Sequence, residues 1–103
     1  MSQVAVFVVH KTKPGKREQV QAVWQQHMAP AIEGNPGHLA YVYSFDATDP
    51  DGICAFQLYA SEQEANAFLK HPSYSMYLKE VEHLLEGPPQ VKSLVPQWRK
   101  GAA

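Results

Sequence analysis

Apolar and polar residues follow two different periods along the chain, and the change of period predicts where strands and helices lie. Val4 to Lys11 is a β-branched and aromatic stretch that ends at the turn residues Thr12-Lys13-Pro14-Gly15, so it is predicted to be a strand. From Lys16 the residues of one face recur at helical spacing, and these are Val20, Val23, Trp24, His27, Met28 and Ala31. The spacing predicts an amphipathic helix that ends at the Gly34-Asn35-Pro36-Gly37 break.

The next two apolar stretches predict a β-hairpin. Because side chains alternate across a strand, one face of the stretch from His38 to Phe45 carries Leu39, Tyr41, Tyr43 and Phe45. Residues 53–60 form a second apolar run. The segment between them, 46–52, carries Asp, Pro and Gly, as a reversing loop requires.

Two helices and one strand are predicted after the hairpin. Ser61, with Glu64 three residues later, forms a capping box that opens a short helix, whose inward residues are Ala65, Phe68 and Leu69. Pro72 interrupts this helix, and helical spacing resumes over 73–86. The last predicted strand covers 90–98, in which Pro96 indicates an edge strand or a strand end.

The predicted order β-α-β-β-α(α)-β indicates one α+β domain spanning residues 1–103 with a four-stranded sheet. Two right-handed crossovers place their helices on the same face of that sheet and leave the other face open. Both sides of the first strand are nevertheless apolar, with Val4, Val6 and Val8 on one and Ala5, Phe7 and Val9 on the other. A soluble monomer rarely exposes such a surface, so we expect a homodimer in which two sheets stack or close into a barrel.

Composition and charge narrow the classes of partner. Nine Lys and Arg against ten Asp and Glu leave a formal net charge of -1, and the basic residues are scattered. Neither nucleic acid nor an anionic membrane is therefore an expected partner. The longest apolar run, 4–9, is too short to span a bilayer, and Cys54, the only cysteine, cannot form an intramolecular disulfide. These features predict a cytoplasmic protein.

Several short segments resemble, in their order and spacing, the antibiotic biosynthesis monooxygenase (ABM) domain family. They are Lys13-Pro14-Gly15-Lys16, Glu33-Gly34-Asn35-Pro36-Gly37, Asp49-Pro50-Asp51-Gly52, and Tyr59-Ala60-Ser61-Glu62-Gln63-Glu64-Ala65 leading to Phe68-Leu69-Lys70-His71-Pro72. The resemblance covers nearly the whole chain and implies a ferredoxin-like βαββαβ domain with an antiparallel sheet, paired as a dimeric α+β barrel. It also implies varied activities, among them cofactor-independent oxygenation of phenols and quinols, haem degradation and isomerisation.

No sequence motif provides for a metal or a nucleotide cofactor. The histidines form no HExxH, HxH or CxxC pattern with other ligand types, and they are His10, His27, His38, His71 and His83. A glycine-rich phosphate loop is also absent from the sequence. We therefore expect no metal and no cofactor, and oxygenase chemistry of the kind the resemblance implies is then cofactor-free. The haem-degrading pattern is not matched, because the first strand lacks its asparagine.

Cofactor-free oxygenation requires a dry apolar pocket, a base for the substrate proton and a donor that stabilises the resulting anion. Tyr74 follows Phe68 by six residues, the spacing at which phenol-oxidising relatives place a catalytic tyrosine after a pocket tryptophan. We predict Tyr74 as the donor, with His71 or His27 as the base. Each also has a structural interpretation: Tyr74 as a packed aromatic, His71 as a helix cap or solvated loop residue, and His27 as a hydrogen-bonded core residue.

The predicted substrate-binding residues are aromatic or polarisable, and they are Trp24, Met28, Tyr41, Tyr43, Phe68 and Tyr77. Ordinary core packing explains the same spacing. Phe68 departs from the family, in which Trp or His often stands at this position, so an indole or imidazole role there is lost.

Two main hypotheses follow. The first is a cofactor-independent monooxygenase that oxidises a small hydrophobic aromatic substrate, such as a phenol, a quinol or a polyketide-like ring. The second is a non-catalytic dimeric module that binds a small apolar ligand or serves in stress response. An isomerase that uses the same cavity is a third possibility.

Overall fold

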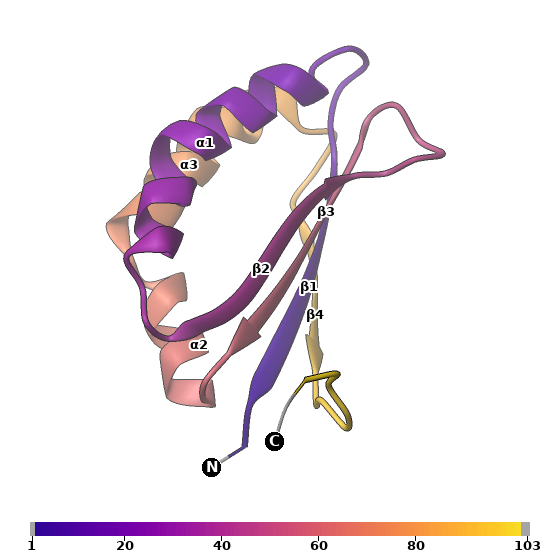
Figure 1. Cartoon of the computed structure of the whole chain (residues 1–103). Coiled ribbons are helices and arrows are strands. Elements are labelled where there is room, and N and C mark those ends of the chain that lie inside the picture. The colour runs from indigo at the N-terminus through magenta and orange to yellow at the C-terminus, as the bar shows by residue number, and fades with distance from the viewer. Residues whose placement is uncertain (1, 102–103) are drawn as a thin grey trace.

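The computed structural model describes residues 2–101 and places three helices against one face of a four-stranded antiparallel sheet (Figure 1). The elements are β1 (Val4–Lys11), α1 (Arg17–Glu33), β2 (His38–Phe45), β3 (Gly52–Tyr59), α2 (Glu62–Leu69), α3 (Pro72–Val81), a 3-10 turn η1 (Glu82–Leu84) and β4 (Gln90–Leu94). The strand order is β2-β3-β1-β4. This is the ferredoxin-like α+β arrangement, and the predicted fold class is confirmed.

The chain turns and caps its helices where the sequence signals them. The hydroxyl oxygen of Ser61 accepts a hydrogen bond from the backbone N–H of Glu64 at 3.2 Å, which opens α2 as predicted. Pro72 does not merely interrupt a helix but is the first residue of α3. Proline is tolerated at this position because the first N–H groups of a helix have no partner within it, so the N–H that proline lacks is not needed. Strand β4 ends at Leu94, two residues before Pro96.

Four predictions differ in detail from the structure. The last strand, predicted over 90–98, ends at Leu94, because Pro96 has no N–H to donate to a neighbouring strand. Helical spacing predicts α3 as far as residue 86, but α3 ends at Val81 and tightens into η1. A register shift between His38 and Ala40 turns Leu39 outward, where it is exposed. Leu69, predicted to point inward at the end of α2, keeps about half of its surface exposed.

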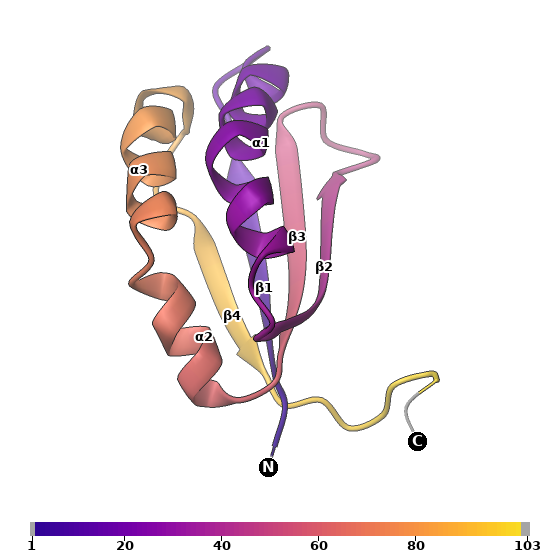
Figure 2. The ribbon, with the colours of Figure 1, turned by 60° about the vertical axis from the view of Figure 1, so that its left-hand side comes forward.

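The register of the sheet arranges side chains in rows that face the helices. Val8 lies between Ala55 and Val91, and Tyr43 lies beyond Ala55 in the same row. The main core forms between this face and the helices, and its most deeply buried members are Val20, Ile53, Tyr59, Tyr77 and Val81. Figure 2 shows α1, α2 and α3 together in front of the sheet, so all three helices contribute to one interior.

The opposite face of the sheet carries apolar side chains that no helix covers. Phe7 pairs with Phe56, and Phe56 pairs with Val42, so three apolar residues continue across β1, β3 and β2. Phe56 is 36% exposed and Val42 is 56% exposed. A single chain therefore leaves part of an apolar row in contact with water.

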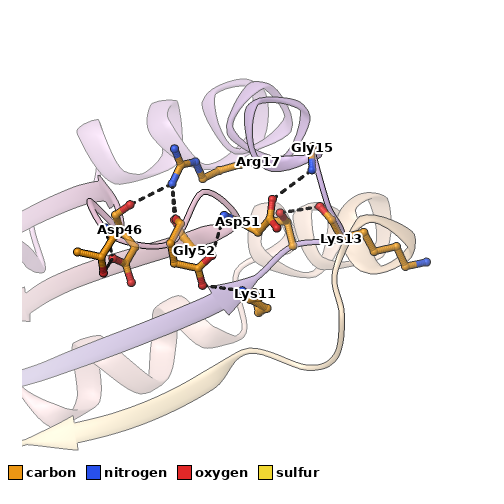
Figure 3. Close-up of polar contacts among 10 residues, drawn as sticks. Lys11, Lys13, Gly15, Arg17, Asp46, Asp51 and Gly52 are labelled. Atoms are coloured by element: carbon orange, nitrogen blue, oxygen red, sulfur yellow. Dashed lines mark hydrogen bonds and ion pairs between the residues drawn. The ribbon is translucent and has the colours of Figure 1, made fainter.

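One arginine ties the hairpin loop to the start of α1 (Figure 3). Nη1 of Arg17 donates to the backbone carbonyl oxygens of Asp46, Asp49 and Gly52 at 3.2, 2.8 and 3.3 Å. The guanidinium also lies 4.1 Å from the centre of the Phe45 ring, a cation–π geometry. Arg17 thus fixes the first turn of α1 over the end of β2.

The same loop is held from β1 by charged groups (Figure 3). Lys11 forms an ion pair with Asp49 at 2.6 Å, and a carboxylate oxygen of Asp51 accepts from the backbone N–H of Gly15 at 3.1 Å. Gly15 has φ of 76°, a conformation that residues with a side chain rarely adopt. These contacts hold the loop between β2 and β3 against the end of β1 and the turn that follows it.

Candidate functional site

A cavity of about 400 Å³ lies between the sheet and the helices. This volume is in the range of small-molecule sites, about 300–1,000 Å³. Its sheet side is built from the helix-facing rows of the four strands. Its helix side includes Trp24 and Met28 from α1, Phe68 from α2, and Tyr74 and Tyr77 from α3.

All five tyrosines of the chain line this one cavity, and they are Tyr41, Tyr43, Tyr59, Tyr74 and Tyr77. Burial raises the pKa of each phenol, to about 12 for Tyr41. The phenols therefore stay protonated at neutral pH and can donate hydrogen bonds.

Two of these hydroxyl groups are already bonded within the chain. The hydroxyl of Tyr41 accepts from the indole N–H of Trp24 at 3.3 Å, and the hydroxyl of Tyr59 donates to the side-chain oxygen of Gln57. Trp24 also packs against Tyr43, with ring centroids 4.2 Å apart. The cavity wall between α1 and β2 is thus a rigid group of aromatic rings.

His10 is the histidine that lies on the cavity among the residues the structure describes. It is 6% exposed, and burial lowers the pKa of its imidazole to about 4, so the ring is neutral at pH 7. Glu62, at the start of α2, supplies the one charged side chain found on the lining within residues 2–101. Apart from Glu62, the lining that the described residues provide is uncharged and consists of aromatic, aliphatic and neutral polar side chains.

Seven of the nine sequence-predicted site residues line the cavity: Tyr74, Trp24, Met28, Tyr41, Tyr43, Phe68 and Tyr77. This shared location brings the predicted donor and the predicted substrate-binding residues together. Their roles in a reaction remain predictions.

The two predicted bases lie elsewhere. Nε2 of His27 pairs with a carboxylate oxygen of Glu80 at 2.9 Å, which joins α1 to α3. Nδ1 of His71 accepts from the backbone N–H of Ser73 at 3.1 Å and caps α3. Neither histidine is among the residues that line the cavity in the described part of the chain, so His27, His71 and Tyr74 do not converge.

Sequence reasoning missed six polar members of the site, of which His10, Gln57 and Tyr59 lie on β1 and β3, and the others are Glu62, Asn66 and Ser93. For His10 a signal existed, because alternation along β1 places it on the same face as Val4, Val6 and Val8. Gln57 and Tyr59 follow the same rule on β3, where they pair with Val6 and Val4. Strand alternation was therefore the better guide to polar residues in this cavity than helical spacing.

The sequence profile of the antibiotic biosynthesis monooxygenase family matches residues 3–80. The chain belongs to the ABM family. The match includes every helix-side residue of the cavity, so in this ABM chain only the lining contributed by β4 and Val95 falls outside the matched segment.

Solved structures have the same fold over almost their whole length. A candidate antibiotic biosynthesis monooxygenase from Chloroflexus aurantiacus has a TM-score of 0.80 and 24% identity, covering 97% of this chain and 98% of its own. Rv0793 from Mycobacterium tuberculosis has a TM-score of 0.85 and 25% identity, covering 97% of this chain and 100% of its own. A protein of unknown function from Nitrosomonas europaea has a TM-score of 0.83 and 22% identity, covering 100% and 97%.

A comparison of the sequence with curated proteins finds no significant match. Within residues 2–101 of this ABM chain, no three His, Cys, Asp or Glu side chains gather as they do around a bound metal ion. The helices of the same region are also too short or too polar to cross a membrane.

Proposed function

We propose that the protein is a monooxygenase that uses molecular oxygen to oxidise a small hydrophobic aromatic substrate, such as a phenol, a quinol or a polyketide-like ring, without flavin or metal. One observation carries the proposal: an aromatic cavity of about 400 Å³ into which the five tyrosines converge. Membership of the ABM family supports the same reaction class.

The chemistry is balanced for a substrate of the anthrone type. Two C–H bonds of the ring methylene break, one atom of O2 enters the product as a carbonyl oxygen, and the other leaves in water. The substrate supplies all four electrons. The first step is transfer of one methylene proton to water, because neither His27 nor His71 lines the cavity. The transfer leaves negative charge on the substrate oxygen, and hydrogen-bond donors fixed around that oxygen lower the barrier.

Tyr74 is the proposed donor. It lines the cavity, and burial raises the pKa of its phenol, so the O–H group remains available at neutral pH. A hydroxyl donor of this kind stabilises the transition state in proportion to the negative charge that develops on the substrate oxygen. Removing one such donor lowers the rate about a hundredfold in well-studied enzymes.

The test is oxygen consumption with anthrone in the presence of a chelator and without added flavin, measured against the rate of autoxidation without protein. We expect one O2 consumed per anthraquinone formed, with one labelled atom in the product when ¹⁸O2 is used. Tyr74→Phe should lose at least about nine-tenths of the rate. Met76→Leu, on the exposed side of the same helix, is the control.

Two other results would replace the proposal. A panel of anthrones and quinols that raises the melting temperature without consuming oxygen would indicate a non-catalytic binding module. Turnover that continues without oxygen would indicate an isomerase. Full activity in Tyr74→Phe would remove Tyr74 from the mechanism.

We also propose that the protein works as a homodimer through the open face of its sheet. Support comes from the apolar row of Phe7, Phe56 and Val42, part of which is exposed in a single chain. Light scattering should give twice the chain mass of 11.5 kDa. Phe56→Lys should lower that mass to one chain, and a wild-type monomer at micromolar concentration would contradict the proposal.

A further inference from the structure

Four buried side-chain polar atoms have no hydrogen-bond partner within the described residues; one of them, Nε2 of His38, lies off the cavity lining, and the other three belong to residues that line the cavity. These three are Nδ1 of His10, the hydroxyl oxygen of Tyr43 and the hydroxyl oxygen of Tyr77. Leaving a buried polar group unpaired costs about 1–3 kcal/mol, and folded proteins keep few of them. Three such groups around one cavity indicate that a partner is supplied from outside the chain.

The three side chains belong to one end of the cavity. The rings of His10 and Tyr77 meet edge-on, with centroids 5.9 Å apart. Tyr43 lies in the row of Ala55 and Val8, and His10 follows Val8 on the same face of β1.

The rest of the cavity does not share this property. The hydroxyls of Tyr41 and Tyr59 have partners in Trp24 and Gln57. The unpaired groups therefore form a local set rather than a general feature of the lining. A ligand that reaches them can gain hydrogen bonds there without first breaking any within the chain.

We propose that His10, Tyr43 and Tyr77 form a subsite that binds the hydroxyl group of an uncharged aromatic ligand. A hydroxyl group can donate to Nδ1 of the neutral imidazole and accept from both phenols, which matches the three groups. A carboxylate has no proton to donate, and no cationic side chain within residues 2–101 lines the cavity to offset the burial of its charge. The inference rests on the proposed function only in taking the same cavity as the site, and it names the part of the substrate that is recognised.

The subsite is tested by equilibrium binding without oxygen, so that no turnover contributes. Isothermal calorimetry at pH 7.5 compares three probes that share one ring system: 1-naphthol, naphthalene and 1-naphthoate. We expect 1-naphthol to bind at least about tenfold more tightly than naphthalene, which corresponds to one or two additional hydrogen bonds. Naphthoate should bind more weakly than either.

His10→Phe and Tyr77→Phe should each reduce the preference for 1-naphthol over naphthalene to less than about threefold. Both variants replace an unpaired polar group by an apolar group of similar shape, so they should fold, and His10→Phe should not lower the melting temperature at pH 7.5. His83→Phe, at an exposed position in η1, is the matched control and should keep the wild-type preference. If one variant fails to fold, the test is decided by the ratio of the affinities for 1-naphthol and naphthalene in the other variant and in Tyr43→Phe.

Equal binding of 1-naphthol and naphthalene, tight binding of naphthoate, or a preference that survives in the variants would each overturn the subsite. So would the absence of binding by every probe. Oxygen consumption is measured separately: if anthrone is oxidised but the preference is absent, the subsite fails and the monooxygenase stands. If the preference is present but oxygen is not consumed, the subsite stands and the monooxygenase fails.

Discussion

The indole N–H of Trp24 donates to the hydroxyl oxygen of Tyr41 over 3.3 Å, and this bond connects α1 to β2 across the wall of the cavity. The same indole packs against the ring of Tyr43. One side chain of α1 is thereby held by two tyrosines of a single strand.

A double-mutant cycle should detect the bond between Trp24 and Tyr41. We expect Trp24→Phe and Tyr41→Phe to be coupled by about 1 kcal/mol in the free energy of unfolding, since each removes one partner of the same hydrogen bond. The measurement is urea unfolding of the two single variants and the double variant. Trp24→Phe combined with Tyr59→Phe is the control, because Tyr59 bonds Gln57 instead; equal coupling in both cycles would contradict the prediction.

The cap on α3 predicts a separable effect at His71. His71→Ala removes the acceptor for the Ser73 N–H and should lower the free energy of unfolding by about 1 kcal/mol. His71→Asn keeps an acceptor at the N-cap and should recover most of that loss. Thermal and urea unfolding of both variants measure the difference.

Activity distinguishes the cap from the base that the sequence suggested. If the folded Asn variant loses turnover of anthrone while its stability is restored, the imidazole of His71 takes part in the reaction. Retained turnover leaves the cap as its role.

The protein should become less stable as the pH is lowered, because of His10. Burial lowers the pKa of its imidazole from the ordinary value of 6.5 to about 4. Between these pH values the unfolded chain binds a proton that the folded protein excludes, so the contribution is complete above pH 6.5 and is lost toward pH 4. The difference amounts to about 3 kcal/mol at most. Burial also lowers the pKa of His38, which acts in the same direction.

Urea unfolding at pH 7 and pH 4.5 measures this effect, and His10→Phe should show a clearly smaller loss of stability between the two. Carboxyl groups also make the free energy of unfolding depend on pH, but at lower pH than His10 does. Hydrogen bonds from Thr48 to Asp46 and from Lys11 to Asp49 hold the pKa of those carboxyls below 3.8. A pH slope that is the same in His10→Phe and the wild type would show that another group is responsible.

The sequence predicted the fold closely where an element depends only on the residues within it and at its ends. The bounds of β1 and β2 and the cap at Ser61 follow from strand propensity and turn residues, whereas the last strand, predicted as far as residue 98, ends at Leu94. The end of α3 did not follow, because Leu84 and Leu85 continue the apolar period while the backbone has already tightened into η1. Apolar spacing reports which side faces the core, not which hydrogen-bond pattern the backbone adopts.

The site was predictable in its aromatic part but not in its histidines. Seven predicted residues share the cavity because the inward faces of a strand and of three helices meet there. His27 lies on the apolar stripe of α1, yet that stripe faces α3 as well as the sheet, and Glu80 of α3 provides a partner that no spacing reveals. His10 could have been predicted from the alternation of side chains along a strand, if that alternation had been extended to the polar residue that ends the apolar run of β1.

The two tryptophans of the chain occupy opposite environments: Trp24 lines the cavity, and Trp98 is 82% exposed. Their fluorescence therefore reports on different places, and a ligand that enters the cavity should alter the emission of Trp24 while Trp98 remains a constant background. A Trp98→Phe chain would emit from the cavity wall alone. The protein thus contains its own optical probe, so occupancy of the cavity can be followed in solution before any substrate is identified and without any turnover.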